Sequence, residues 1–250
     1  MSLPDPVFPP LLSGHAVDAE SSAFAEARAG VEVGRYGAGD LLWSRREDQL
    51  DCALVLEPDV VLEQAIQMAP LVMVAIGDAL GAIGPPNLAI MYRWPFDIFA
   101  NGGHVGEVCL GLPAGAQAGS VPAHLIVGVR MSIFRRAGDA EPGHDVARTM
   151  LHEEGAGDLD RTQLLETLSR HTLSWIDRWE SEGFEPLGEL WLLRAADRGG
   201  TVSAIIGGGK VAGQFAGLDS AGSLLLDTAE GQLTVPLTDA VLAGHKAAHD

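Results

Sequence analysis

The sequence predicts an α+β fold, in which helices pack against a mixed or antiparallel sheet and a small C-terminal β-barrel follows. Short apolar runs that end at Gly or Pro alternate with two long segments of helical periodicity. Apolar residues make up 47% of the 250 residues, which is enough to bury a core. The composition changes near Arg198, where short strands and tight turns begin. We therefore expect a large domain over residues 1–198 and a small SH3-like barrel over residues 199–250.

The first third of the chain predicts two helices and one buried strand. Alanines at helical spacing predict a helix over residues 15–30, and residues 51–56 read as a strand. Apolar residues from Leu62 to Leu80 follow the helical period and predict a long, mostly buried helix. Pro70 predicts that this helix is kinked or begins there.

The middle of the chain predicts antiparallel strands. Residues 88–94 and 98–100 read as strands, and Asn101-Gly102-Gly103 is typical of a hairpin turn. Residues 104–112 and 123–133 read as two further strands. The sequence thus predicts a hairpin whose turn separates Asp97 from His104.

One loop and one helix complete the large domain. The polar stretch over residues 135–157 predicts a surface loop that is long enough to be functional. Asp160 and Gln163 resemble a capping box, and apolar residues at helical spacing predict a helix that ends before Gly183.

The charge and the cysteines exclude several classes of protein. A net charge of −18 repels a phosphate backbone, so we expect no binding of nucleic acid. Cys52 and Cys109 form no CxxC pattern, and the histidines show no ligand spacing, so we expect no disulfide framework and no metal site. The N-terminus lacks the features of a signal peptide, and no segment is expected to span a membrane. We therefore expect a cytoplasmic protein.

Lysine is nearly absent from this sequence. Lys210 and Lys246 are the only two, and the first two hundred residues contain none. A mechanism that requires a lysine in the large domain is therefore excluded.

The stretch RWPFDIFANGGHVGE, from Arg93 to Glu107, resembles the central motif of the biotin and lipoate protein ligases. Further similarities follow in the same order along the chain. They are LIVGVRM at 125–131, the helix from Asp160, EGFEPLGELW at 182–191 and GLDSAGSLLLDTAEGQ at 217–232. The last segment is similar to the C-terminal barrel of bacterial biotin ligases.

The resemblance implies an activity, a co-substrate and partners. Ligases of this superfamily activate a carboxylic acid with ATP and Mg to an acyl-adenylate, then transfer the acyl group to a lysine of a carrier domain. The acid is biotin, lipoate or octanoate, and the partner is a biotinyl- or lipoyl-carrier protein. The sequence leaves the choice of acid open.

The resemblance also assigns residues, with departures. His104 stands where the family has the lysine that contacts the acyl carboxyl group and phosphate, and Arg93 replaces the first lysine of the motif. His104, Arg93 and Asp97 are therefore the expected catalytic residues. A histidine is charged only part of the time near neutral pH, so its charged form is the one expected to act. Arg130 stands where the family has an asparagine and is an expected substrate-binding residue.

Further substrate contacts are expected from the family's Gly/Arg-rich loop and from Trp94. The loop corresponds to residues 34–40 and keeps Arg35, Gly37 and Gly39. These glycines are equally compatible with an ordinary turn. We expect Arg35, Arg93 and Arg130 to line one pocket with His104.

Two alternatives to the ligase hypothesis remain open. The lost lysine also fits a catalytically silent protein that binds a small acid or a carrier domain. A cysteine route would use Cys109 as the nucleophile and His104 as the base. Five residues separate them, so on a regular strand their side chains point to opposite faces unless a bulge intervenes.

Overall fold

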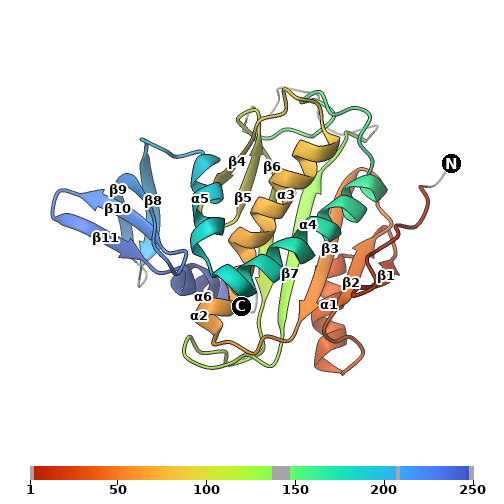
Figure 1. The fold of residues 1–250 in the computed structure, drawn as a ribbon, viewed down its shortest axis with the longest axis horizontal. Helices are drawn as coiled ribbons and strands as arrows, with labels where there is room; N and C mark the ends of the chain where they lie inside the picture. The colour runs from red at the N-terminus through yellow and green to blue at the C-terminus, as the bar shows by residue number, and fades with distance from the viewer. Residues whose placement is uncertain (1–2, 137–146, 207–208, 248–250) are drawn as a thin grey trace.

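A computed structural model describes residues 3–136, 147–206 and 209–247 of the chain. Two sheets lie side by side along the longest axis, and helices pack between and around them (Figure 1). The larger sheet has seven strands and the smaller has four. Residues 137–146, in the predicted surface loop, lie outside the described residues.

The larger sheet is mixed and has the strand order β1-β2-β3-β7-β6-β5-β4. β1 is parallel to β2, and the other neighbours are antiparallel. The strands are β1 (Ser13–Val17), β2 (Asp40–Ser44), β3 (Gln49–Leu56), β4 (Ile90–Arg93), β5 (Asp97–Ala100), β6 (Gly103–Gly111) and β7 (Leu125–Ser132). The predicted strands and the hairpin turn are thereby confirmed, with φ of 48° at Asn101 and 93° at Gly102.

The central helix of the molecule is α3 (Met68–Ile83), which follows the short α2 (Leu62–Ala65). The break between the two and the place of Pro70 in the first turn of α3 confirm the expectation from proline. Most α3 side chains are buried against the sheet and α4 (Arg161–Glu182). The expectation that no segment is long enough to span a membrane was wrong, because residues 62–83 are. In the structure, 78% of the apolar window is buried inside the protein.

The first predicted helix begins later than the sequence suggested. Residues 13–17 form β1, and α1 (Ala23–Glu32) begins only after Ser22, whose Oγ accepts a hydrogen bond from the backbone N–H of Ala25. The prediction over 15–30 was wrong at its start because alanine spacing does not report where a cap ends the preceding extended chain. α1 packs on β2, β3 and β7.

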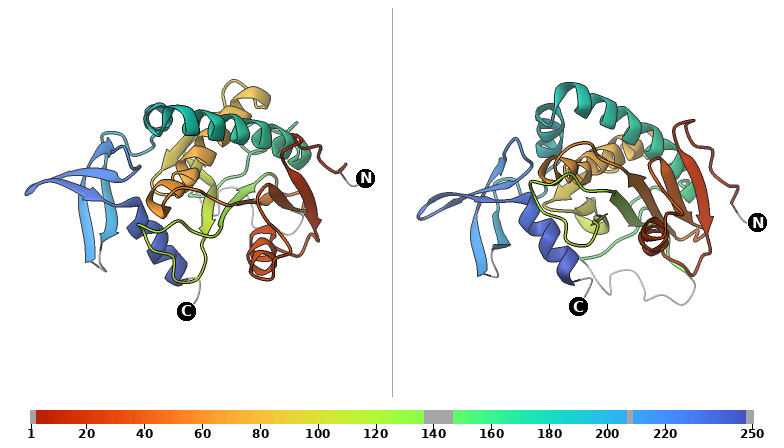
Figure 2. Two further views of the ribbon diagram at one scale, coloured as in Figure 1. Left: turned by 60° about the horizontal axis from the view of Figure 1, so that its bottom comes forward. Right: turned by 90° about the horizontal axis from the view of Figure 1, so that it is seen from below.

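Helices cover both faces of the large sheet. α3 and α4 lie on one face, and α1 lies on the opposite face (Figures 1 and 2). Two separate apolar clusters reflect this: Cys52 packs toward α3 and α4, whereas its neighbour Ala53 packs toward α1. Alternate residues of a strand point to opposite faces, so the sheet buries both.

The helix α4 begins at Asp160, whose Oδ1 accepts the backbone N–H of Gln163 at 2.9 Å, as the capping pattern predicts. It ends at Gly183, and α5 (Glu185–Leu193) follows directly. α5 then leads the chain toward the second sheet (Figure 1).

The smaller sheet is antiparallel, with the strand order β11-β10-β9-β8. Its strands are β8 (Thr201–Ile206), β9 (Gly209–Leu218), β10 (Leu224–Thr228) and β11 (Gly231–Val235). The barrel stays a prediction, since within the described residues these strands form a four-stranded sheet. The helix α6 (Leu237–Ala247), which the sequence did not predict, packs on α2, β6 and β8. The C-terminal segment thus returns to the large sheet.

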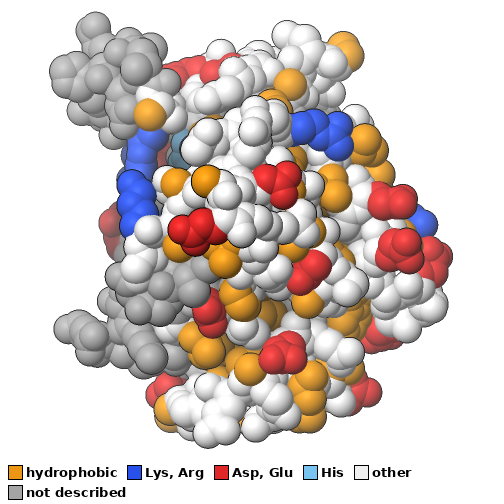
Figure 3. All heavy atoms as spheres, turned by 90° about the vertical axis from the view of Figure 1, so that its left-hand side faces the viewer, with side chains coloured by type: hydrophobic (Ala, Val, Ile, Leu, Met, Phe, Trp, Pro, Cys, Tyr) orange, Lys and Arg blue, Asp and Glu red, His pale blue; other side chains and the backbone are white. Residues whose placement is uncertain are grey.

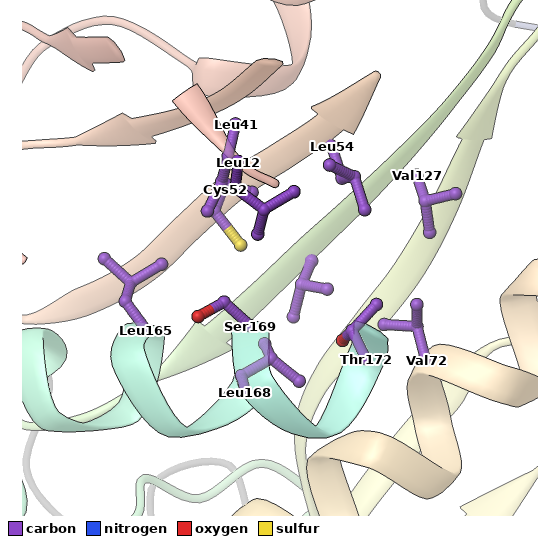
Figure 4. A pocket seen from close by; sticks show the side chains of 11 residues that line it. Leu12, Leu41, Cys52, Leu54, Val72, Val127, Leu165, Leu168, Ser169 and Thr172 are labelled. Atoms are coloured by element: carbon purple, nitrogen blue, oxygen red, sulfur yellow. The ribbon is translucent and has the colours of Figure 1, made fainter. Parts of the chain in front are cut away.

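A small void lies between the large sheet and α4 (Figure 4). Its walls are mainly leucine and valine side chains, with the Cys52 sulfur, Ser169 and Thr172. At about 30 Å³ it has room for about one water molecule, so it is a packing defect and not a substrate site.

A polar cluster joins α3, α4, α5 and β4. The carboxylate of Asp78 accepts hydrogen bonds from Trp175 Nε1 at 2.9 Å and from Arg194 Nη1 at 3.1 Å. Arg194 Nη1 also donates to the hydroxyl of Tyr92 at 3.1 Å. A Cβ added at Gly77 would collide with Tyr92 and Arg194, so the cluster requires glycine there.

We expect Gly77→Ala to destabilise the protein by about 1–3 kcal/mol, because the added methyl group overpacks the Tyr92–Arg194 contact. Gly81→Ala, in the same helix but with open space around the new Cβ, is the matched control. It should be neutral or stabilise by up to about 1 kcal/mol, since alanine favours helix. Urea unfolding of both variants measures the difference. Equal effects of the two substitutions would contradict the role assigned to the cluster.

Candidate functional site

A β-bulge in the β5–β6 hairpin decides which way His104 points. Asp97 pairs with Glu107 and Ile98 with Gly106, but the next pair is Phe99 with His104, so Val105 is the extra residue. On a regular strand, His104 and Glu107 would point to opposite faces. The bulge places both on the face that carries Asp97 and Phe99, while Val105 enters the core with 2% of its surface exposed.

Five charged residues form a row across this face of the sheet. The register pairs Arg93 with Asp97, Asp97 with Glu107, Glu107 with Arg130, and Arg130 with Asp51. The row crosses five neighbouring strands, β4-β5-β6-β7-β3. Four charged residues singled out above or their neighbours, far apart in sequence, therefore share one line, with two carboxylates directly opposite each other at its centre.

His104 and Asp97 are in contact at the β4 side of the row. His104 Nε2 lies 3.2 Å from Asp97 Oδ1, and the imidazole meets Phe99 edge-on with ring centroids 5.4 Å apart. The guanidinium of Arg93 lies 4.4 Å from the centre of the Phe99 ring, and its Nε donates to Asp197 at 3.1 Å. The three expected catalytic residues therefore form one group, in which Arg93 is hydrogen-bonded to Asp197.

Glu107, Arg130 and Asp51 continue the row toward α1. Arg130 Nη1 lies 3.9 Å from Glu107 Oε1, at the outer limit of an ion pair, and both side chains are about half exposed. Asp51 is buried and accepts the backbone N–H of Ala23 at 3.3 Å, at the start of α1. Burial raises the pKa of the Asp51 carboxyl, and the nearby Arg130 charge opposes that rise. Arg130 therefore faces one carboxylate on each side.

A cavity of about 300 Å³ opens beside the centre of the row. Asp97 and Glu107 line it together with aromatic, aliphatic and thiol groups from several elements. The lining residues are Phe24, Arg28, Pro95, Phe96, Asp97, Glu107, Val108, Cys109, Leu110 and Val241. α1 and α6 lie on this side of the sheet (Figure 2), so segments from both ends of the chain enclose it. Its volume is at the lower end of the range of about 300–1,000 Å³ for small-molecule sites.

Burial controls the chemistry of the thiol in this cavity. It raises the pKa of Cys109 to about 12, and the negative charge of Glu107 acts in the same direction. Because of the bulge, Cys109 and His104 share a face, so the geometric objection to a cysteine route does not hold. The thiolate, however, is the nucleophilic form, and its fraction at neutral pH is very small.

The Gly-rich loop is held by acidic side chains. Gly37 N–H donates to Asp40 Oδ2 at 2.8 Å, and Ala38 N–H donates to Glu57 Oε1 at 3.3 Å. Arg35 Nη1 pairs with Glu26 at 2.8 Å, and Gly39 has a φ of 86° that suits glycine. Two amides that could receive a phosphate are therefore already bonded to carboxylates.

The expected site residues thus separate into two groups. Arg93, Asp97, His104 and Arg130 share one face of the sheet, whereas Arg35, Gly37 and Gly39 belong to the loop after α1, none of whose residues lines the described cavity. The expectation that Arg35 joins the other two arginines in one pocket was wrong, because Arg35 is paired with Glu26.

Trp94 faces the second sheet. Its Nε1 donates to the backbone carbonyl of Gly222 at 3.1 Å, and its ring packs with the apolar residues of that sheet. The Trp94–Pro95 peptide bond is cis. Trp94 therefore joins the β4–β5 turn to the C-terminal part of the chain, from which Val241 enters the cavity.

Sequence reasoning missed four residues of this site: Phe24, Arg28, Val241 and Asp197. Phe24 and Arg28 are four residues apart on α1, and that spacing was the one available signal that they share a face. Among the described residues, no three His, Cys, Asp or Glu side chains group as metal ligands do. Acidic side chains are scattered over the face seen in Figure 3.

Comparison with known proteins agrees with this architecture. The sequence matches the Biotin/lipoate A/B protein ligase family over residues 8–193 and the Biotin protein ligase C terminal domain over residues 199–241. It is 30% identical over 194 residues to a biotin–[acetyl-CoA-carboxylase] ligase of Paracoccus denitrificans, covering 76% of this chain and 79% of that protein. It is 26% identical to the bifunctional ligase/repressor BirA of Bacillus subtilis, of which it spans about half (54%).

Solved structures show the same fold. A biotin protein ligase-like protein of unknown function from Silicibacter superposes with a TM-score of 0.82 at 30% identity, over 93% of this chain and 97% of that one. The biotin protein ligase of Aquifex aeolicus, solved in complex with biotin and ATP, has a TM-score of 0.72 at 19% identity, over 89% and 95%. The large mixed sheet, its helices and the C-terminal sheet follow that architecture, and the chain belongs to the biotin/lipoate A/B protein ligase family.

Proposed function

We propose that this protein activates a small carboxylic acid with ATP to an acyl-adenylate and transfers the acyl group to a lysine of a biotinyl- or lipoyl-carrier domain. The carboxylate attacks the α-phosphorus of ATP and pyrophosphate leaves. The lysine amine then attacks the acyl carbon and AMP leaves. The observation that supports this most is the row of charges beside the 300 Å³ cavity, on the sheet face where the family motif lies.

His104 is the proposed electrostatic catalyst. Its ring is fixed by Asp97 at 3.2 Å and by the edge contact with Phe99. A charged imidazolium beside a carboxylate keeps its orientation and can still offer a donor to negative charge that develops on the substrate. Arg93 and Arg130, which flank the two carboxylates along the row, are the cations proposed to receive phosphate oxygens.

The Gly-rich loop is proposed to contribute less than in the family pattern. Asp40 and Glu57 accept its Gly37 and Ala38 amides, and Arg35 is paired with Glu26. Phosphate would have to displace these carboxylates, whose charge opposes it. We therefore expect ATP to depend on the arginines of the sheet face and on Mg brought with the nucleotide. A cytoplasmic location fits a reaction that consumes ATP.

Replacement of His104 tests this proposal. We expect His104→Ala to lower the rate of acid-dependent AMP release by about 10²–10³-fold, because it removes a donor that acts on developing charge. His104→Lys should retain or raise the rate. It should also flatten its pH dependence from about pH 6 to about pH 9, since lysine stays charged there. His171→Ala, on α4, is the control. The assay supplies biotin, lipoate and octanoate separately, and equal rates for His104→Ala and the parent would contradict the proposal.

Cys109 is not expected to carry the acyl group, because burial keeps its pKa near 12. Iodoacetamide at about pH 8 should leave Cys109 of the folded protein unmodified and label it once the chain is unfolded in urea. Peptide mapping distinguishes it from Cys52. Cys109→Ser should keep full acyl transfer. Rapid labelling of the folded protein, or loss of transfer in Cys109→Ser, would instead favour a thioester route.

A further inference from the structure

Two carboxylates meet at the cavity without a close cation between them. Asp97 and Glu107 are directly opposite each other on β5 and β6, and both line the cavity. Cβ atoms of such cross-strand pairs are about 4.5–5.5 Å apart, and like charges at that separation destabilise a sheet. Packing does not demand either charge, since Asp97 is 39% and Glu107 48% exposed.

The two arginines of the row do not compensate for this repulsion at close range. The Nε of Arg93 donates to Asp197, and its guanidinium lies on Phe99. Arg130 is 3.9 Å from Glu107 and also faces Asp51 on its other side. The contact of Asp97 with His104 holds one of its oxygens at 3.2 Å. An unfavourable pair that is kept at the mouth of a cavity is typical of a functional site.

From this arrangement we propose that the cavity binds a small molecule through a primary ammonium group, which Asp97 and Glu107 receive between them. Phe24, Phe96 and Leu110 offer apolar walls for an alkyl chain that carries the ammonium. A metal ion fits less well, because the described residues contain no third ligand grouped with these two. This inference rests on the proposed function only in using the same site.

The same chemistry rejects a plain alkyl tail. Octanoate or lipoate would cover the two carboxylates with apolar carbon and offer them no donor, and burying a charge without a partner is costly. An ω-amino acid offers an ammonium at one end and keeps the carboxylate that adenylation requires at the other. Two sources of the ammonium group fit: the acid substrate itself, or the lysine side chain of the acceptor protein.

Calorimetry without ATP tests the inference with a matched pair of ligands. Octanoate and 8-aminooctanoate differ only in the terminal ammonium, and we expect the protein to bind the amino acid about tenfold more tightly. Glu107→Gln, which preserves shape, should abolish that preference, and Asp97→Asn should reduce it. Glu189→Gln, an exposed position on α5, is the charge-matched control and should retain the preference.

A third probe, Nα-acetyl-lysinamide, separates the two sources. Binding of 8-aminooctanoate lost in Glu107→Gln assigns the ammonium to the acid, whereas binding of the lysine amide alone assigns it to the acceptor. Octanoate bound as tightly as 8-aminooctanoate, together with no binding of the lysine amide, would overturn the inference. So would a preference that Glu107→Gln leaves unchanged. Because these are binding measurements, AMP release can fail while the ammonium site stands, and the reverse.

Discussion

The fold depends on a single buried acid, Asp78, the one charged residue of helix α3. Its carboxylate holds Trp175 of α4 and Arg194 at the end of α5, and Arg194 in turn holds Tyr92 of β4. Burial raises the pKa of the Tyr92 hydroxyl to about 12, so it stays a neutral acceptor for the guanidinium. Backbone hydrogen bonds from Tyr92 to Arg194 and Ala196 reinforce the same junction. One cluster therefore fixes the helical layer, an edge strand and the exit of the chain toward the second sheet.

This junction positions the candidate site from both sides. The strand that it anchors, β4, ends at Arg93 and Trp94, so the β4–β5 turn and Asp97 follow directly from it. The chain that leaves Arg194 builds the small sheet, whose Gly222 carbonyl receives the Trp94 indole N–H. α6 then returns and brings Val241 to the cavity. The small sheet thus contributes to the site through contacts with Trp94 and through α6, even though the charged row belongs to the large sheet.

The charged row and the loop after α1 have opposite electrostatic character. On the sheet face, Arg93, Arg130 and His104 alternate with carboxylates and can compete for them with a ligand. In the loop, Asp40 and Glu57 already occupy backbone amides. In a chain with a net charge of −18 and no lysine before position 210, positive charge is scarce. Its concentration on one face of the sheet is the strongest electrostatic argument for placing the chemistry there.

The sequence by itself determined the strands, both long helices, the hairpin turn and the family, because periodicity, caps and an ordered motif are local signals. Alanine spacing failed at residues 15–22, since β1 forms only by pairing with β2. Tertiary structure alone decided the direction of His104, because a one-residue bulge inverts the alternation that a sequence pattern assumes. It also decided that Asp97 and Glu107 meet and that Arg35 turns to Glu26. Cross-strand register and side-chain pairing arise between segments distant in sequence, where no local pattern records them.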